Sequence, residues 1–133
     1  MRPLAIAEFV ASFGKAVEVC CGYYCEVAKI LKDRGLLLCV CDKNKEAGEV
    51  FSGLGIEFFA CDVENPGDRL LEVCRKADVV YSIRPPPELW ESIFSLAKLT
   101  GCVCIIRPMS CDFVERRHLR SHGGENFLVY EPD

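Results

Sequence analysis

The chain has 133 residues, of which 50% are hydrophobic and 27% are charged; this length and composition suit one folded domain and exclude a disordered polar chain. Its formal net charge of −4 argues against a general nucleic-acid-binding surface, which needs an excess of Lys and Arg. The sequence has no run of about 18 apolar residues that could span a membrane and no signal-peptide pattern, so a cytoplasmic protein is expected.

Helical and apolar segments alternate along the chain, beginning with a helix expected over residues 3–13. Five short apolar runs follow, at residues 16–20, 36–41, 56–61, 78–83 and 102–106. Continuous apolarity is typical of strands that are buried on both faces. Segments of helical length separate the runs, at residues 23–34, 44–54, 67–77 and 87–99. This alternation predicts right-handed βαβ units that build one mostly parallel sheet with helices on both faces.

The part of the chain after Pro108 has a weaker pattern. Residues 127–131 (FLVYE) predict a last strand, which we place at an edge of the sheet. His118 and His122 have the spacing of residues on one face of a helix, and the basic stretch at residues 116–120 makes the protein surface their expected context.

Acidic residues stand at the ends of the first three apolar runs. Glu18 lies near the end of the first, Asp42 directly follows the second and Asp62 directly follows the third. The carboxyl ends of parallel strands meet at one crevice, and an acid about 20 residues past the first glycine turn accepts hydrogen bonds from ribose hydroxyls. Asp42 is 20 residues past Gly22. The alternative is that each carboxylate only caps the helix that follows it.

The three acids and the glycine turn resemble the pattern of Rossmann-like S-adenosylmethionine-dependent methyltransferases over residues 15–107. The turn keeps only the middle glycine of that pattern, Gly22. The resemblance implies a doubly wound Rossmann-like domain of five to six strands over residues 1–133. It also implies that Glu18 and Gly22 hold the methionine end of S-adenosylmethionine, that Asp42 holds the ribose, and that Asp62 lies near the adenine.

An Ile-Arg-Pro sequence occurs at the end of both the fourth and the fifth run. It places Arg84 before Pro85 and Arg107 before Pro108, and Ser82 lies just ahead of Arg84. A proline disfavours the helical region for the residue before it, so an extended backbone is expected at both arginines. Arginine forks suit carboxylate or phosphate oxygens, so these residues predict a site for a substrate or an anion.

The alternative for the two arginines is a structural ion pair with Glu88, Asp112 or one of the strand-end acids. The surrounding segment at residues 81–89 (YSIRPPPEL) also resembles a family of small uncharacterised archaeal proteins. That resemblance extends over nearly the whole chain and implies a family without implying an activity.

The ten cysteines lie in or beside apolar runs, where they would serve as small core residues. No CxxC spacing is present, so no metal site is expected. A disulfide stays open as an alternative, since some thermophile proteins contain intracellular bridges.

Two functional hypotheses follow for a small-molecule ligand. The first is a protein that binds an adenosine-containing anionic ligand, with S-adenosylmethionine as the leading candidate and a methyltransferase as the expected activity. The second is a non-catalytic module that senses NAD or another nucleotide and works within a homo-oligomer. The sequence identifies no general base, so no catalytic residue is assigned.

Overall fold

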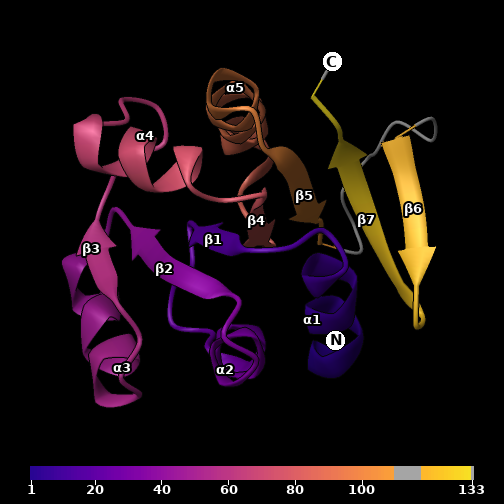
Figure 1. Ribbon diagram of the computed structural model, residues 1–133, viewed down its shortest axis with the longest axis horizontal. Coiled ribbons are helices and arrows are strands. Elements are labelled where there is room, and N and C mark those ends of the chain that lie inside the picture. Colours follow the sequence, from indigo (N-terminus) through magenta and orange to yellow (C-terminus); the bar gives the residue numbers. More distant parts are fainter. Residues whose placement is uncertain (110–117, 133) are drawn as a thin grey trace.

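The computed structural model describes residues 1–109 and 118–132, and it contains one seven-stranded sheet in the order β3-β2-β1-β4-β5-β7-β6 (Figure 1). The strands are β1 (Ala16–Val19), β2 (Leu37–Asp42), β3 (Phe58–Ala60), β4 (Val79–Ile83), β5 (Val103–Arg107), β6 (Leu119–His122) and β7 (Glu125–Tyr130). The first five strands run parallel to one another. The predicted doubly wound α/β architecture is therefore confirmed, with more strands than the five to six expected.

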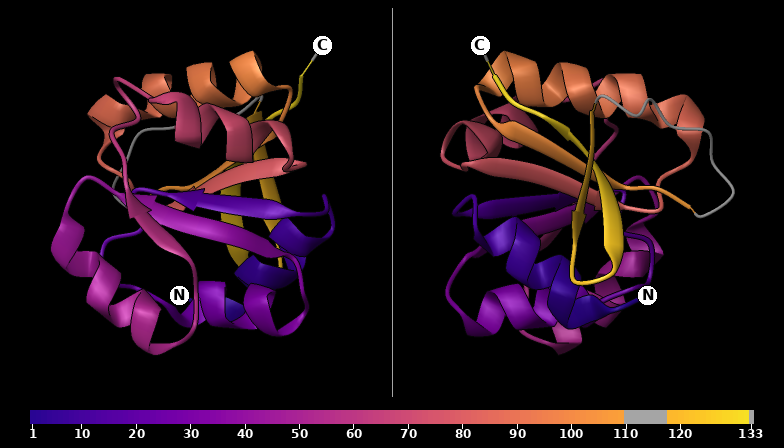
Figure 2. Two further views of the ribbon diagram at one scale, coloured as in Figure 1. Left: turned by 60° about the vertical axis from the view of Figure 1, so that its left-hand side comes forward. Right: turned by 90° about the vertical axis from the view of Figure 1, so that its right-hand side faces the viewer.

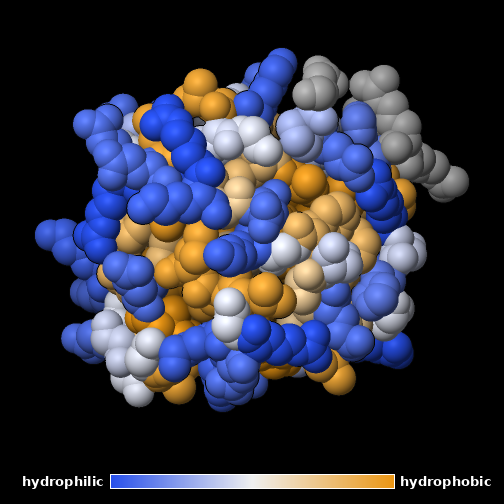
Figure 3. All heavy atoms as spheres, viewed as in Figure 1, coloured by the Kyte–Doolittle hydropathy of each residue, from blue (hydrophilic) through white to orange (hydrophobic). Residues whose placement is uncertain are grey.

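Helices cover both faces of the sheet (Figures 1 and 2). The helices are α1 (Pro3–Ala11), α2 (Glu26–Asp33), α3 (Gly48–Gly53), α4 (Asp68–Arg75) and α5 (Trp90–Thr100). α4 and α5 cover one face, where Leu70 and Ile93 pack against Val17 and Val80 of the sheet. α1, α2 and α3 cover the other face. In the orientation of Figure 3, apolar side chains gather between these two helical layers, with hydrophilic side chains around them.

β1 lies at the point where the strand order reverses, because it pairs with β2 on one side and β4 on the other. The connection from β1 leads outward through β2 to β3, and the later strands are added on the opposite side. The loop after β1 leads to α2 on one face of the sheet, and the loop after β4 leads to α5 on the other face. The two loops therefore diverge, which opens a crevice at the carboxyl ends of the strands. The fold thus fixes the place where a ligand site is expected.

The helix boundaries follow local chemistry. α2 begins at Glu26 rather than near Tyr23, because residues 20–25 form an irregular turn. Pro87 opens a short 3₁₀ helix, Pro87–Leu89, that leads into α5; proline suits this position because its missing N–H has no partner in a first helical turn. At the other end of α5, Gly101 has φ +78°, a conformation that glycine adopts without strain. None of the helices in the described ranges is long and apolar enough to cross a membrane.

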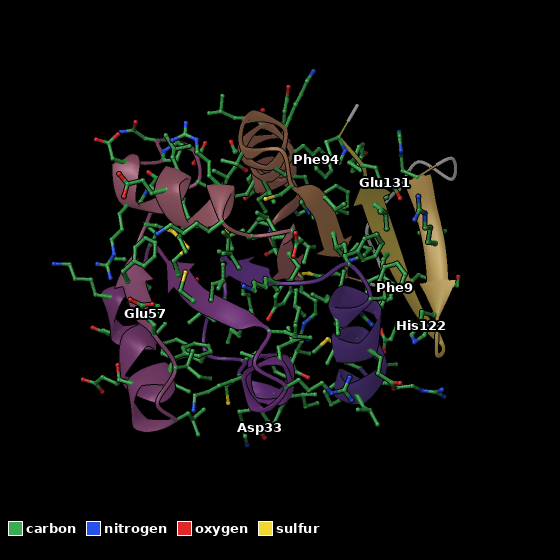
Figure 4. All side chains as sticks on the ribbon, viewed as in Figure 1. Phe9, Asp33, Glu57, Phe94, His122 and Glu131 are labelled. Carbon is green, nitrogen blue, oxygen red and sulfur yellow. A yellow bond between two sulfur atoms is a disulfide. The ribbon has the colours of Figure 1, made fainter. Side chains whose placement is uncertain are left out.

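The C-terminal segment forms a hairpin of β6 and β7 that differs from the prediction. β7 pairs antiparallel with both β5 and β6, so it is an inner strand and β6 is the edge strand. The prediction that His118 and His122 lie on one face of a helix is also wrong, since His122 ends β6. Its ring lies against Phe9 of α1, with the two ring centres 5.8 Å apart (Figure 4). His118 stacks on Tyr130.

Most of the described cysteines are buried, as predicted, and act as small core residues. Cys39, Cys74, Cys102 and Cys104 pack in the cluster between the sheet and α4–α5. Cys41 and Cys61 instead form a disulfide that joins β2 to the residue after β3, with their Cα atoms 5.8 Å apart. The alternative of a disulfide is therefore the correct one for this pair.

Reduction of the Cys41–Cys61 disulfide should lower the free energy of unfolding by about 3 kcal/mol, because the bridge closes a loop of a size that restricts the unfolded chain by about this amount. The measurement is chemical denaturation with and without a thiol reductant. A Cys41→Ala/Cys61→Ala variant is the control, since it should not respond to the reductant. An equal response of the variant and the wild type would contradict the assignment.

Candidate functional site

A pocket of about 980 Å³ lies at the carboxyl ends of β1 to β5. This volume lies at the upper end of the range of about 300–1,000 Å³ that is usual for small-molecule sites. The segments that follow all five parallel strands contribute to its wall, and among the sequence-predicted site residues it brings together Gly22, Asp42, Asp62, Arg84 and Arg107. Glu18, Ser82 and Pro85 are buried beneath this surface rather than in it.

The turn after β1 forms the floor of the pocket. Cys20 has φ +54° and Gly22 has φ +55°, so both take the left-handed conformation. Glycine adopts this conformation freely, but a residue with a Cβ does so at a cost of about 1–3 kcal/mol. Strain of this kind persists only where neighbouring interactions enforce it, and here it occurs in the pocket floor.

Asp42 provides such an interaction. Its Oδ2 accepts a hydrogen bond of 2.7 Å from the Gly22 amide, and its Oδ1 accepts one of 2.9 Å from the Asn44 amide. The carboxylate thus joins the turn after β1 to the turn after β2. The capping alternative describes part of its role, but each carboxylate oxygen has a second lone pair that a ligand could use.

Asp62 has a related geometry at the end of β3. Its Oδ1 accepts a 2.9 Å hydrogen bond from the Glu64 amide, and its Oδ2 lies 3.6 Å from Nζ of Lys43. The Lys43 side chain is 77% exposed and the Asp62 side chain 36% exposed, so the pair contributes little to stability. Asp62 lines the pocket, and its Oδ2 is held by this weak ion pair.

Glu18 lies in β1, beside Tyr81 of β4, and is 1% exposed. Its Oε1 accepts a 2.6 Å hydrogen bond from the Tyr81 hydroxyl, and its Oε2 has no partner among the described residues. Burial raises the pKa of Glu18 from its usual 4.5 to about 8; the Tyr81 hydrogen bond opposes this shift and the charge of Asp42 adds to it. Glu18 is therefore mostly protonated at neutral pH.

Cys20 and Cys21 also contribute to the floor. Burial, together with the charges of Asp42, Asp62 and Glu18, raises the pKa of the Cys20 thiol to about 12. Burial also raises the pKa of Cys21, and the charges of Glu18 and Asp42 add to the effect. Since the thiolate is the nucleophilic form, neither cysteine is activated at neutral pH.

Arg84 is exposed in the pocket wall and has φ +52°. The extended backbone expected from the following proline is thus wrong at this residue. The Arg84 amide donates a 2.7 Å hydrogen bond to the Arg107 carbonyl, and this contact holds the end of β4 in its strained conformation. The guanidinium carbon of Arg84 lies 5.8 Å from the centre of the Tyr24 ring.

Ser82 and Pro85 flank Arg84 below the surface. Ser82 is 1% exposed, and its Oγ has no hydrogen-bond partner in the described part of the chain. Pro85 is buried, and its carbonyl accepts a 3.2 Å hydrogen bond from the Trp90 indole. The Trp90 hydrogen bond thus holds the backbone on the Pro85 side of Arg84.

Arg107 forms an ion pair with Glu125, with Nε and Oε1 2.8 Å apart and Glu125 only 4% exposed. The other Glu125 oxygen accepts a 2.7 Å hydrogen bond from the Arg2 amide. Burial alone would raise the pKa of Glu125, but the hydrogen bonds from Arg107 and Arg2 and the charge of Arg107 lower it. The structural ion pair considered for the arginines thus exists for Arg107, although with a partner that the sequence did not suggest.

Glu125 is the site-associated residue that sequence reasoning missed. It directly follows Gly123 and Gly124, a position where an acid is expected to be an exposed turn residue. The only available signal was that it precedes a run of apolar residues predicted to form a strand. Asp112, another partner considered for the arginines, lies outside the described residues.

Solved structures with the same fold include two that are described as methyltransferases. A protein of Pyrococcus horikoshii matches with a TM-score of 0.59 and 16% identity, over 78% of this chain and 52% of that one. A possible histamine N-methyltransferase of Thermotoga maritima, described as S-adenosylmethionine-dependent, matches with a TM-score of 0.53 and 16% identity, over 78% of this chain and 50% of that one. The chain therefore spans about half the length of these two proteins. The plantazolicin methyltransferase BpumL, solved in complex with SAH, matches with a TM-score of 0.51 and 18% identity, over 77% of this chain and 45% of that one.

Sequence relatives match over nearly the whole chain. A protein of Archaeoglobus fulgidus is 33% identical over 97% of this chain and 95% of its own length. A protein of Pyrococcus furiosus is 37% identical over 96% of this chain and 98% of its own length. The model of the uncharacterised protein family UPF0146 matches residues 3–132. The chain belongs to the uncharacterised protein family UPF0146.

Proposed function

We propose that the pocket binds S-adenosylmethionine and that the chain is an S-adenosylmethionine-dependent methyltransferase. The observation that carries this proposal is the convergence of Gly22, Asp42 and Asp62 on one pocket at the point where the strand order reverses. The fold shared with methyltransferases supports the choice of cofactor class.

The adenosine would lie against the ends of β2 and β3. Asp42 is fixed by two backbone amides, so its remaining lone pairs have a defined direction for ribose hydroxyls. Asp62 and its neighbours Val63 and Glu64 line the adjoining wall, where the adenine would lie. Carboxylates that are already held by the backbone lose little entropy when they bind a ligand.

The methionine end would lie over the turn after β1. Gly22 allows close approach, because a Cβ at this residue would meet nothing within 4 Å and the space above it is open. Glu18 and Ser82 each have a buried oxygen with no partner in the described ranges. Buried polar atoms are normally paired, so bound water is a candidate partner for each of these oxygens beneath the pocket floor.

A bound cofactor would supply an electrophilic methyl group. The chain's own contribution would be to bind and orient it, since the Cys20 and Cys21 thiols stay protonated at neutral pH. Positioning of reacting groups accounts for a large share of catalysis when the acceptor is itself nucleophilic.

A specific observation also favours the second hypothesis, a module that senses NAD or another nucleotide. The exposed Arg84 lines the same pocket as Asp42 and Asp62, so an anion-binding side chain lies in one pocket with the two strand-end acids. Under this alternative, the aspartates would hold a ribose and the exposed Arg84 a phosphate.

Titration calorimetry with S-adenosylmethionine and its demethylated product tests the proposal. Wild-type protein should bind both, and Asp42→Asn should weaken binding about tenfold, because hydrogen bonds to charged groups contribute about 1.5–3 kcal/mol. Asp62→Asn keeps the acceptor for the Glu64 amide and should show a smaller loss. Asp33→Asn is the matched control, since Asp33 is exposed at the far end of α2 (Figure 4).

The same titrations with NAD and ATP separate the two hypotheses. Binding of NAD or ATP in place of S-adenosylmethionine, with the same loss in Asp42→Asn, would support the nucleotide-sensing module. Absence of heat with S-adenosylmethionine at millimolar concentration would remove the methyltransferase proposal.

The protonated state of Glu18 predicts a pH-dependent stability. The pKa of Glu18 is about 8 in the folded protein against 4.5 ordinarily, so the folded state binds the extra proton between these values. The free energy of unfolding should therefore fall as pH rises from about 5 to 8, by at most about 1.4 kcal/mol per pH unit from this group. Glu18→Gln resembles the protonated acid and should lack this fall.

Denaturation curves at several pH values measure this effect. Glu72→Gln is the control, because Glu72 is exposed on α4 and the variant should keep the wild-type pH dependence. Identical pH profiles for Glu18→Gln and the wild type would show that Glu18 is ionised in the fold.

A further inference from the structure

The pocket has two chemically different halves. The ends of β1, β2 and β3 supply the carboxylates, and the ends of β4 and β5 supply the two arginines. Three strand spacings separate β3 from β4, which amounts to about 14 Å across the sheet. A ligand group bound at Asp62 is therefore remote from one bound at Arg84.

The arginine half has an apolar wall. Ile83, Pro86 and Leu89 line it from the segment after β4, and Met109 lines it from the segment after β5. Met109 remains 39% exposed and Ile83 8% exposed, so apolar surface is accessible beside the arginines. This wall suits a ligand with an apolar body.

The two arginines differ in how their charges are compensated. Arg107 is 17% exposed in its side chain and is paired with the buried Glu125 carboxylate at 2.8 Å. Arg84 has no carboxylate within 4.0 Å among residues 1–109 and 118–132, and its guanidinium lies over the Tyr24 ring. Of the two arginines, Arg84 is thus the one whose charge is available to a ligand.

The backbone at Arg84 is held in a strained conformation. The residue holds φ +52° although a proline follows it, and its amide is anchored to the Arg107 carbonyl at 2.7 Å. Two further prolines, Pro86 and Pro87, stiffen the loop beyond Pro85. Strained residues that are held by such surroundings occur preferentially at ligand clamps.

We propose that the half of the pocket at the ends of β4 and β5 binds a second, anionic molecule with an apolar body, whose carboxylate or phosphate is held by Arg84. Its role as a methyl acceptor rests on the proposed function, but its binding does not. Arg107 acts as a positioning residue, because its side chain pairs with Glu125 while its carbonyl holds the Arg84 amide.

Binding of small probes tests this proposal. Benzoate and phenyl phosphate combine an apolar ring with an anion, and benzylamine has the same ring with a cation. Their dissociation constants would be measured by ligand-observed NMR on the full chain, with and without the demethylated cofactor. We expect the two anions to bind and benzylamine not to bind; the tighter of the two anions identifies carboxylate or phosphate as the preferred group.

Matched variants locate the charge. Arg84→Gln should weaken anion binding at least about tenfold, as expected for a charged hydrogen-bonding partner. Arg34→Gln removes a charge at the exposed end of α2 and should leave anion binding unchanged. Arg84→Lys keeps the charge but loses the planar guanidinium that can donate two parallel hydrogen bonds, so it should give an intermediate affinity. Thermal unfolding checks that each variant is folded.

Several results would overturn the proposal: equal anion affinity in Arg84→Gln and the wild type, binding of benzylamine as tight as that of benzoate, or loss of cofactor affinity in Arg84→Gln equal to its loss of anion affinity. The last result would assign Arg84 to the cofactor. If the wild-type protein does not bind the demethylated cofactor but still binds the anions through Arg84, the proposed function fails and the anion site stands.

Discussion

The hydrogen bond from the Gly22 amide to the Asp42 carboxylate is the contact on which the pocket depends. It ties the end of the central strand β1 to the end of β2. The turn after β1 can leave the sheet in this direction only because Cys20 and Gly22 both take the left-handed conformation. A glycine-poor turn thus reaches the geometry of a pocket floor through a side-chain contact, at the cost of strain at Cys20.

A second carboxylate organises the other side of the molecule. Glu125 binds Arg107 with one oxygen and the Arg2 amide with the other, so it connects β5, the C-terminal hairpin and the start of α1. Removal of one partner from a buried pair leaves a charge without compensation, which makes this contact structurally important. It also neutralises Arg107, and of the two pocket arginines it leaves Arg84 as the one without a carboxylate partner among the described residues. The charge pattern of the site therefore follows from the way the hairpin is held.

The sequence was sufficient to predict the parallel part of the sheet, because the five apolar runs are buried on both faces and alternate with helices. β6 was missed because the sequence of this edge strand, LRSH, is polar and mostly exposed. The inner position of β7 depends on pairing with β5, which no local pattern reports. At the site, the strand-end position of Asp42 and Asp62 was enough to place them at one pocket, whereas ligand binding by them stays a prediction.

The conformation of Arg84 shows where local rules fail. The proline that follows favours an extended backbone, but the hydrogen bond to the Arg107 carbonyl enforces a left-handed one. Likewise, Glu125, the ion-pair partner of Arg107, lies 18 residues further along the chain, at the start of β7. Both features depend on contacts between strands that are distant in sequence, so they require the structure.

The central claim is that a cofactor lies over the β1 turn and against the aspartates. The most direct test is the amide NMR spectrum of the full chain during titration with the demethylated cofactor. The account predicts that the largest shifts occur at Gly22, Lys43 and Glu64, with little change at Asn126 in the C-terminal hairpin. Saturating ligand that leaves these amides unshifted, or that shifts the hairpin instead, would contradict it.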